Sequence, residues 1–299
     1  MGVGRLCMLF GKTRQAFYGK EWHFKERFQE AMIALELVAE VRRELPGLGT
    51  HKLYRLIRKP LETHGIKIGR DRLHRILHDH GLIIRKRKSY PKTTYSKHWM
   101  KKYPNLIKQI IASESEQVWV SDITYICVGY DFNYLSLITD VYSKKIVGYC
   151  LHPYLNNEGS LIALDMALAG RRKLSNPLIH HSDRGVQYCS FDYVLRLREA
   201  NVKISMTENG DVYENAIAER VNGILKTEFN LNKIYRTSTE AKLAIEESIE
   251  AYNSKRPHMS CNYLTPMQAH EMKGVLEKKW KSKNYQNRSE EHTSELQSQ

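Results

Sequence analysis

The feature that most constrains this fold is a change in hydrophobic period near residue 118. From Val118 to Ile126 the sequence reads V-W-V-S-D-I-T-Y-I, a run of β-branched and aromatic residues that predicts a strand. Before this run, apolar residues recur at helical spacing, and after it short apolar runs alternate with amphipathic ones. The sequence therefore predicts an all-helical N-terminal module followed by an α/β core.

The α/β part is expected to hold a mixed sheet. Strands at residues 133–140 and 145–151 would form an antiparallel meander with the first. Beyond them strands alternate with helices, which predicts parallel pairing in the same sheet. The expected helices cover residues 158–168, 191–200, 216–229 and 239–252, and the expected strands residues 178–181 and 203–206.

Three helices are expected in the N-terminal third. The first covers residues 26–45, and the second begins at Thr50, whose hydroxyl can cap it. The third runs from about residue 70 to residue 80 and is ended by Gly81. Two short helices joined by a tight turn, the second rich in arginine, are typical of a helix-turn-helix, although a plain three-helix bundle would show the same pattern.

On that interpretation residues 23–84 are a helix-turn-helix DNA-binding domain, and residues 1–22 are a fragment of a second such motif. Arg70, Arg72 and Arg75 project from the last helix away from its apolar side and are candidate DNA contacts.

The net charge of +14 is concentrated in the same region. Residues 1–110 contain 25 Lys and Arg against 9 Asp and Glu, whereas the remainder contains 22 against 24. A basic module beside a nearly neutral one indicates a polyanion-binding arm, with a well-solvated basic surface as the alternative.

A basic linker is expected at residues 85–111. Its cluster of Arg85, Lys86, Arg87 and Lys88 is followed by lysines that alternate with tyrosine and tryptophan. Such a segment suits a strand lying along nucleic acid, and a solvated tether would look similar.

Other classes of protein fit poorly. There is no apolar run long enough to span a membrane, and no leader peptide is expected at the start. The five cysteines form no C-x-x-C pair, so neither a disulfide framework nor a zinc site is expected. A cytoplasmic bacterial protein associated with the nucleoid is the expectation.

Three carboxylates are candidates for metal-dependent chemistry. Asp122 lies in the middle of the first strand, where an unpaired carboxylate would be expensive to bury. Asp183 follows a short apolar strand, and Glu219 lies on a helix with 35 residues between the two. Carboxylate oxygens are the ligands preferred by Mg²⁺ or Mn²⁺, and two such ions suffice for phosphoryl transfer.

The helix around Glu219 has an unusual polar stripe. Asn215, Glu219, Asn222 and Lys226 share one side at i, i+4, i+7 and i+11. A solvated amphipathic helix would also have a polar side, but usually with repeated Glu and Lys pairs.

At these residues the chain resembles the DDE transposases of bacterial insertion sequences, in particular the family whose enzyme is often made from two overlapping reading frames. The resemblance covers about residues 5 to 285. It is specific because its motifs are several and correctly ordered: W-V-S-D-I-T-Y (119–125), D-V-Y-S-K-K-I-V-G (140–148), H-S-D-R-G-V-Q-Y (181–188), N-A-I-A-E-R-V-N-G-I-L-K-T-E (215–228), Y-N-S-K-R-P-H (252–258) and L-T-P-M-Q-A (264–269).

The resemblance implies a ribonuclease-H-like core of the retroviral-integrase type at residues 112–272. It implies that Asp122, Asp183 and Glu219 bind two Mg²⁺ or Mn²⁺ ions, cleave the inverted-repeat ends and join the 3′-hydroxyl to target DNA. Lys226, with Asn222 beside it on the stripe, is assigned to DNA. A homo-oligomer on paired ends is expected.

Some features depart from the family. Glu214 stands where an aspartate is usual, and no leucine zipper is visible, so a first-frame helix-turn-helix partner is a further expectation. Residues 273–287 are taken as a C-terminal tail. Residues 288–299 fit neither family nor fold and are interpreted as a non-native sequence artefact.

Two other functions remain open from the sequence. One is a DNA-binding regulator without catalysis, which an intact carboxylate triad disfavours. The other is a ribonuclease-H-like nuclease acting on RNA hybrids or junctions, which the N-terminal helices disfavour.

Overall fold

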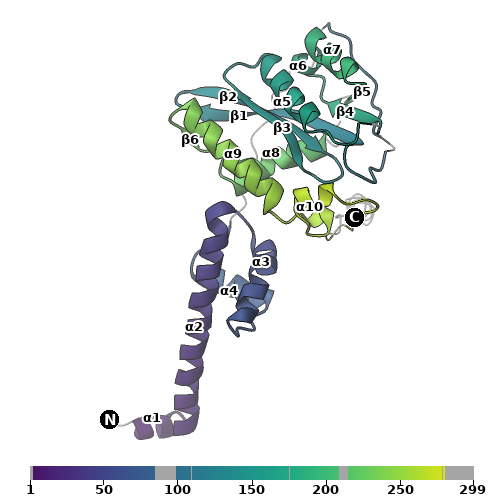
Figure 1. Cartoon of the computed structure of the whole chain (residues 1–299). Coiled ribbons are helices and arrows are strands. Elements are labelled where there is room, and N and C mark those ends of the chain that lie inside the picture. Colours follow the sequence, from purple (N-terminus) through teal and green to yellow (C-terminus); the bar gives the residue numbers. More distant parts are fainter. Residues whose placement is uncertain are drawn as a thin grey trace, which may run out of the picture. The chain divides into compact units, whose positions relative to one another are not determined.

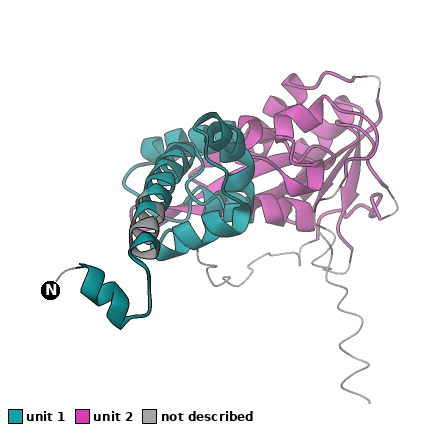
Figure 2. Ribbon diagram, turned by 90° about the horizontal axis from the view of Figure 1, so that it is seen from below, with its two compact units in different colours: residues 1–93, 223–251 teal, residues 94–222, 252–299 magenta. Residues whose placement is uncertain are grey.

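The computed structural model describes residues 3–84, 99–108, 110–174, 176–208, 215–277 and 279, without the side chains of residues 16–21 and 23–25. The chain divides into two compact units, coloured separately in Figure 2. Unit 1 contains residues 1–93 and 223–251, and unit 2 contains residues 94–222 and 252–299.

Unit 1 is helical, as Figure 1 shows for its N-terminal part. The elements of unit 1 are α1 (Val3–Leu9), α2 (Arg14–Glu44), α3 (Thr50–Thr63), α4 (Arg70–Asp79), α8 (Ala216–Glu228), β6 (Ile234–Tyr235) and α9 (Ser238–Ser254). Two of these helices extend into unit 2, which contains the part of α8 before residue 223 and the part of α9 after residue 251.

Helices α2, α3 and α4 pack into a small bundle. Their apolar residues recur at three and four positions, so each helix presents one buried side to the others. The buried side chains include Ala34, Val38, Leu53, Ile57, Leu61, Leu73 and Leu77. Gly81 takes a left-handed φ of +67° just past the end of α4, as expected for the residue that stops this helix.

Two details of this bundle differ from the sequence expectation. Helix α2 begins at Arg14, twelve residues before the expected start at residue 26, and therefore continues through the expected boundary between residues 22 and 23. The cap of α3 is Gly49 rather than Thr50, and no side chain caps it. The hydroxyl of Thr50 instead lies 3.4 Å from Nδ1 of His74 on α4.

Residues 223–251 group with the N-terminal helices in unit 1, and the core boundaries expected at 112 and 272 stay a prediction. One local cause is close packing between the loop after α2 and the end of α8. The backbone N–H of Gly47 donates to the carbonyl of Glu228 at 2.7 Å, and Lys52 Nζ lies 3.5 Å from the Glu228 carboxylate. A Cβ on Gly47 would come within 2.5 Å of Glu228 Cα, so this approach requires glycine.

Unit 2 contains the sheet and the helices around it (Figure 1). The elements wholly within it are β1 (Val118–Val128), β2 (Asp131–Asp140), β3 (Ile146–His152), α5 (Glu158–Ala169), β4 (Leu178–Ser182), α6 (Val186–Cys189), α7 (Phe191–Glu199), β5 (Val202–Met206), the 3₁₀ helix Met259–Cys261 and α10 (Pro266–His270).

The sheet is mixed, as predicted. Its strands follow the order β3-β2-β1-β4-β5, with β1–β2 and β2–β3 antiparallel and β1–β4 and β4–β5 parallel. Helix α5 packs on β2 and β3, and α7 packs on β5. The antiparallel meander followed by βα units is the arrangement expected from the change of period along the sequence.

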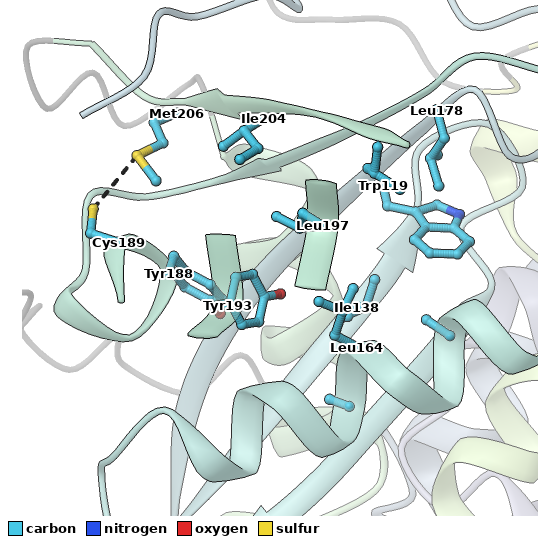
Figure 3. Close-up of a cluster of buried hydrophobic side chains, with 13 residues drawn as sticks. Trp119, Ile138, Leu164, Leu178, Tyr188, Cys189, Tyr193, Leu197, Ile204 and Met206 are labelled. Carbon is cyan, nitrogen blue, oxygen red and sulfur yellow. Dashed lines mark hydrogen bonds between the residues drawn. The ribbon is translucent and has the colours of Figure 1, made fainter. Parts of the chain in front are cut away.

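The hydrophobic core of this unit joins the sheet to α5, α6 and α7. Figure 3 shows Trp119 and Leu178 at one end of the buried cluster and Cys189 and Met206 at the other. Tyr188 and Tyr193 lie between these ends with their ring centroids 5.4 Å apart, edge to face. A core of this size and aromatic content gives β1 and β4 a rigid support.

Asp140 joins several loops to the end of β2. It is fully buried, and its carboxylate accepts hydrogen bonds from the backbone N–H groups of Glu116 and Ser143, both at 2.8 Å. The hydroxyl of Ser143 also contacts Nδ1 of His270 at 2.9 Å, which ties α10 to the end of β2.

Within the described residues, none of the helices combines the length and the apolar character needed to cross a lipid bilayer.

The contact between β3 and α5 generates a test of the fold. A Cβ on Gly148 would lie 2.1 Å from the carbonyl oxygen of Ala163, so Gly148→Ala must push α5 away from the sheet. We expect it to lower the free energy of unfolding by about 2–3 kcal/mol in chemical denaturation. Gly170→Ala is the matched control, because a Cβ there meets nothing closer than 3.6 Å, and an equal loss in both variants would contradict the account.

Candidate active site

The parallel pairing of β1 with β4 brings two of the predicted carboxylates together. Ser121 on β1 lies opposite Ser182 on β4 in the register. Asp122 is the next residue of β1, which continues to Val128, and Asp183 is the first residue after the end of β4. The two carboxylates therefore follow paired residues of neighbouring strands, and Asp183 lies at the carboxyl end of its strand, a usual place for ligand chemistry in α/β sheets.

Helix α8 is attached to the same stretch of β1 by two amides. Asn215 Nδ2 donates to the carbonyl of Ser121 at 3.1 Å, and Asn222 Nδ2 donates to Asp122 Oδ2 at 2.8 Å. Glu219 lies between these two asparagines on the same side of the helix. The negative charge of Glu219 is close enough to act on Asp122, so α8 carries the third carboxylate to the first.

The surroundings of Asp122 disfavour the negative charge of its carboxylate. Burial, and next the charge of Asp183, raise the pKa of Asp122 to about 7, and Glu219 adds a smaller contribution in the same direction. Hydrogen bonds from Asn222 and from the backbone N–H of Ile123 oppose this rise in the pKa but do not cancel it. A carboxylate in this state is stabilised by an added positive charge.

Asp183 is fixed by the turn that follows β4. Its Oδ1 accepts the backbone N–H of Gly185 at 3.0 Å. A Cβ on Gly185 would also lie only 3.0 Å from that oxygen, so the glycine leaves room for the carboxylate.

Three buried polar side chains, Ser121, His180 and Tyr193, join β1, β4 and α7. His180 Nε2 lies 2.6 Å from the Ser121 hydroxyl and 2.9 Å from the Tyr193 hydroxyl. Burial lowers the pKa of His180 to about 3, so the ring is neutral and can accept from these hydroxyls. Sequence reasoning missed this group, although a serine and a histidine inside apolar strands were a visible signal.

The remaining motif residues near Asp183 are structural contacts. His181 is buried, and its Nδ1 lies 2.8 Å from the hydroxyl of Ser205 on the neighbouring strand β5. Tyr188 is buried against Tyr193 in the core.

The residues around Asp122 fit a hard divalent cation, although a complete ligand set is not preformed. Among the described residues no three His, Cys, Asp or Glu side chains lie close enough to hold one ion. The donors present are carboxylate and amide oxygens, the type that Mg²⁺ prefers. Two of them, Oδ1 of Asn215 and Oδ1 of Asn222, are buried and find no hydrogen-bond partner in the described part of the chain.

The predicted DNA-contact residues have different surroundings. Asn222 is only 6% exposed and bonded to Asp122, which places it within the carboxylate site. Lys226 lies on α8 one turn beyond it and is partly buried. The basic cluster of Arg85, Lys86, Arg87 and Lys88 lies outside the described residues.

Helix α4 presents its arginines at a surface groove. The groove has a volume of about 390 Å³ and is lined by Arg27, Arg72, Arg75, Ile76 and Asp79. Arg72 forms an ion pair with Glu30 of α2.

Arg75 is exposed at the groove, whereas Arg70, also exposed, pairs with the adjacent Asp71. The structure therefore separates one arginine that braces the bundle from one that is open at its surface.

Comparison with known proteins identifies the core. Two models described as integrase core domain match residues 112–211 and 200–266. An insertion element IS600 31 kDa protein of Shigella sonnei is 34% identical, over 87% of this chain and 96% of its own length. The transposase for insertion sequence element IS629 of Shigella sonnei is 30% identical, over 90% and 91%.

Solved structures of integrases also align with the chain. The catalytic core domain of HTLV-2 integrase in complex with magnesium aligns with a TM-score of 0.43 at 19% identity, covering 53% of this chain and 98% of that one.

The raised pKa of Asp122 predicts a stability change with a defined sign. Between about pH 4 and pH 7 the Asp122 carboxyl is protonated in the folded chain and ionised in the unfolded chain. Proton binding by Asp122 therefore favours folding at low pH, and this contribution to stability is lost as the pH rises through the folded pKa of about 7. We expect Asp122→Asn to raise the free energy of unfolding at pH 8 in EDTA by about 2–4 kcal/mol, and the gain to shrink at pH 5.

The control for this measurement is Asp165→Asn, which removes an exposed carboxylate paired with Arg196 on the same unit. That variant should change stability by less than about 1 kcal/mol at either pH. A loss of stability in Asp122→Asn at pH 8 would contradict the electrostatic account.

Proposed function

The chain belongs to the DDE-type transposases of insertion sequences, whose catalytic part is an integrase core domain of ribonuclease-H-like fold, and on that premise we propose how it acts. It cleaves the inverted-repeat ends of its element and transfers the 3′-hydroxyl to target DNA, with Asp122, Asp183 and Glu219 as the catalytic carboxylates. The observation that carries this assignment is that Asp122 and Asp183 each follow one of the paired residues Ser121 and Ser182, while Asn222 of α8 donates to the Asp122 carboxylate.

The protein's own residues supply the positioning. The Asn222 amide fixes one oxygen of Asp122, the Gly185 N–H fixes one oxygen of Asp183, and α8 presents Glu219 between two buried amides. Two Mg²⁺ or Mn²⁺ ions, when bound, would activate the attacking hydroxyl and stabilise the leaving oxygen. No separate protein base is then needed, which agrees with the neutral, buried state of His180.

The proposed partners follow from the same chemistry. Both the element ends and the target are DNA, and the two ends must be joined in one reaction, so we propose a homo-oligomer that holds both at the bacterial nucleoid. A first-frame helix-turn-helix chain is a further proposed partner.

In unit 1 we propose that α4 meets the DNA through Arg75. Its guanidinium is exposed at the groove between α4 and α2, where Arg27 adds a second positive charge. The ion pair between Arg72 and Glu30 holds α4 against α2, so Arg72 supports this surface as well as contributing charge. Guanidinium groups bind phosphate oxygens through paired hydrogen bonds.

The catalytic assignment is tested by cleavage and joining of end DNA with Mg²⁺. We expect Asp122→Asn, Asp183→Asn and Glu219→Gln each to reduce both steps by at least about a thousandfold, while DNA binding persists, because the isosteric amides keep shape but remove the charge that holds the metal. Asp165→Asn should keep full activity, because this carboxylate lies on α5 outside the triad. Full joining by any triad variant would refute the assignment, and binding without joining by the unaltered chain would favour a pure regulator.

The DNA contact of unit 1 is tested by the salt dependence of binding. Arg75→Ala should weaken binding to all sequences alike and reduce the slope of log K against log salt by about 1, because one phosphate contact is lost. Arg172→Ala removes an exposed arginine of unit 2 that is paired with Glu271, and should leave the slope unchanged. An unchanged slope in Arg75→Ala would exclude this arginine as a phosphate contact.

A further inference from the structure

Two buried amide oxygens flank Glu219 in the chain, and neither has a hydrogen-bond partner within the described residues. Asn215 and Asn222 are each 6% exposed, and each uses its Nδ2 to bond β1. The Oδ1 atom of each is buried and has no hydrogen-bond partner among the residues that the structure describes. A buried acceptor left without a donor costs about 1–3 kcal/mol, so such groups usually mark the place of a missing partner.

The orientation of both amides is determined by their other contacts. Turning Asn215 over would direct its oxygen at the Ser121 carbonyl, and turning Asn222 over would direct its oxygen at the Asp122 carboxylate. With Asp122 in the ionised form that binds a cation, either change would place two acceptors against each other. The two Oδ1 atoms, and not the two Nδ2 atoms, are therefore the groups left without partners in the folded protein.

A third buried asparagine shows what a purely structural amide looks like in the same unit. Asn253 is 7% exposed, its Oδ1 accepts the backbone N–H of Ile146 at 3.0 Å, and its Nδ2 donates to the carbonyl of Ile146 at 3.0 Å. Both of its polar atoms are satisfied by one strand residue. Asn215 and Asn222 have the same burial and only half of these bonds.

Glu219 lies between the two asparagines in the chain. Asn222 is on α8 three residues after Glu219, so these two side chains project from the same side of the helix, and Asn215 comes just before the first residue of α8. The two asparagines are anchored to consecutive residues of β1, Ser121 and Asp122. The free acceptors therefore border the carboxylates on both sides of Glu219 along the helix.

We propose that Asn215 and Asn222 are positioning residues for the hydrated metal, and that their Oδ1 atoms accept hydrogen bonds from water molecules bound to the ion held by Asp122. The inference rests on the proposed function. Mg²⁺ keeps several of its waters when it binds to proteins, and those waters are donors only, which matches two acceptors that lack donors. An amide in this place orients the hydration shell without changing the charge of the site.

The test measures the affinity of the full chain for Mn²⁺ at pH 8, with the concentration of free Mn²⁺ read from its electron paramagnetic resonance signal. The free energy of unfolding of each variant is measured in parallel. We expect Asn215→Ala and Asn222→Ala each to weaken Mn²⁺ binding by about tenfold or more, the range seen when groups around metal ligands are removed. Asn253→Ala is the matched control: it should lower stability, because it removes two backbone hydrogen bonds, and leave Mn²⁺ affinity within about twofold.

The triad variants separate this inference from the proposed function. If Asp122→Asn and Glu219→Gln abolish Mn²⁺ binding while both asparagine variants behave like Asn253→Ala, the inference is overturned and the triad assignment stands. If the triad variants bind Mn²⁺ as well as the unaltered chain, the metal site itself is misplaced and both ideas fail.

Discussion

The parallel pairing of β1 with β4 is the constraint on which the site depends. It sets Ser121 opposite Ser182, and so fixes the distance between the carboxylates that follow them. Two like charges placed this close repel each other, which is part of why the pKa of Asp122 rises. The strands stay together because their other residues are buried in a shared core, and because His180 links the Ser121 hydroxyl to Tyr193 across the strand boundary.

The start of helix α8 is held against the sheet by two amides. Asn215, just before the helix, donates to the carbonyl of Ser121, and Asn222, two turns into it, donates to the Asp122 carboxylate. Both contacts are specific in direction, and Glu219 lies between them. The position of Glu219 beside Asp122 follows from these two hydrogen bonds.

The sequence was most informative where a pattern repeats. The change of period at Val118 predicted the mixed sheet, and the helical spacing of apolar residues before it predicted the helices α2, α3 and α4. Contacts made through single atoms left no periodic signal, which is why the cap at Gly49, the approach of Gly47 to Glu228 and the bond from Asn222 to Asp122 appear only in the structure. Asn222 illustrates the limit: its helical position was predicted correctly, but its partner depends on how α8 meets β1, which spacing along one helix does not determine.

The choice of amides beside the carboxylates has an electrostatic reason. A lysine or arginine at position 222 could also donate to Asp122, but its charge would neutralise the carboxylate and weaken its hold on a cation. An acid at either asparagine position would add repulsion to a site where the pKa of Asp122 is already raised. An amide can donate to the protein through nitrogen and offer an oxygen to the site without altering its net charge. In the role proposed for them, Asn215 and Asn222 meet both requirements, which would account for buried acceptors at a place where they cost stability.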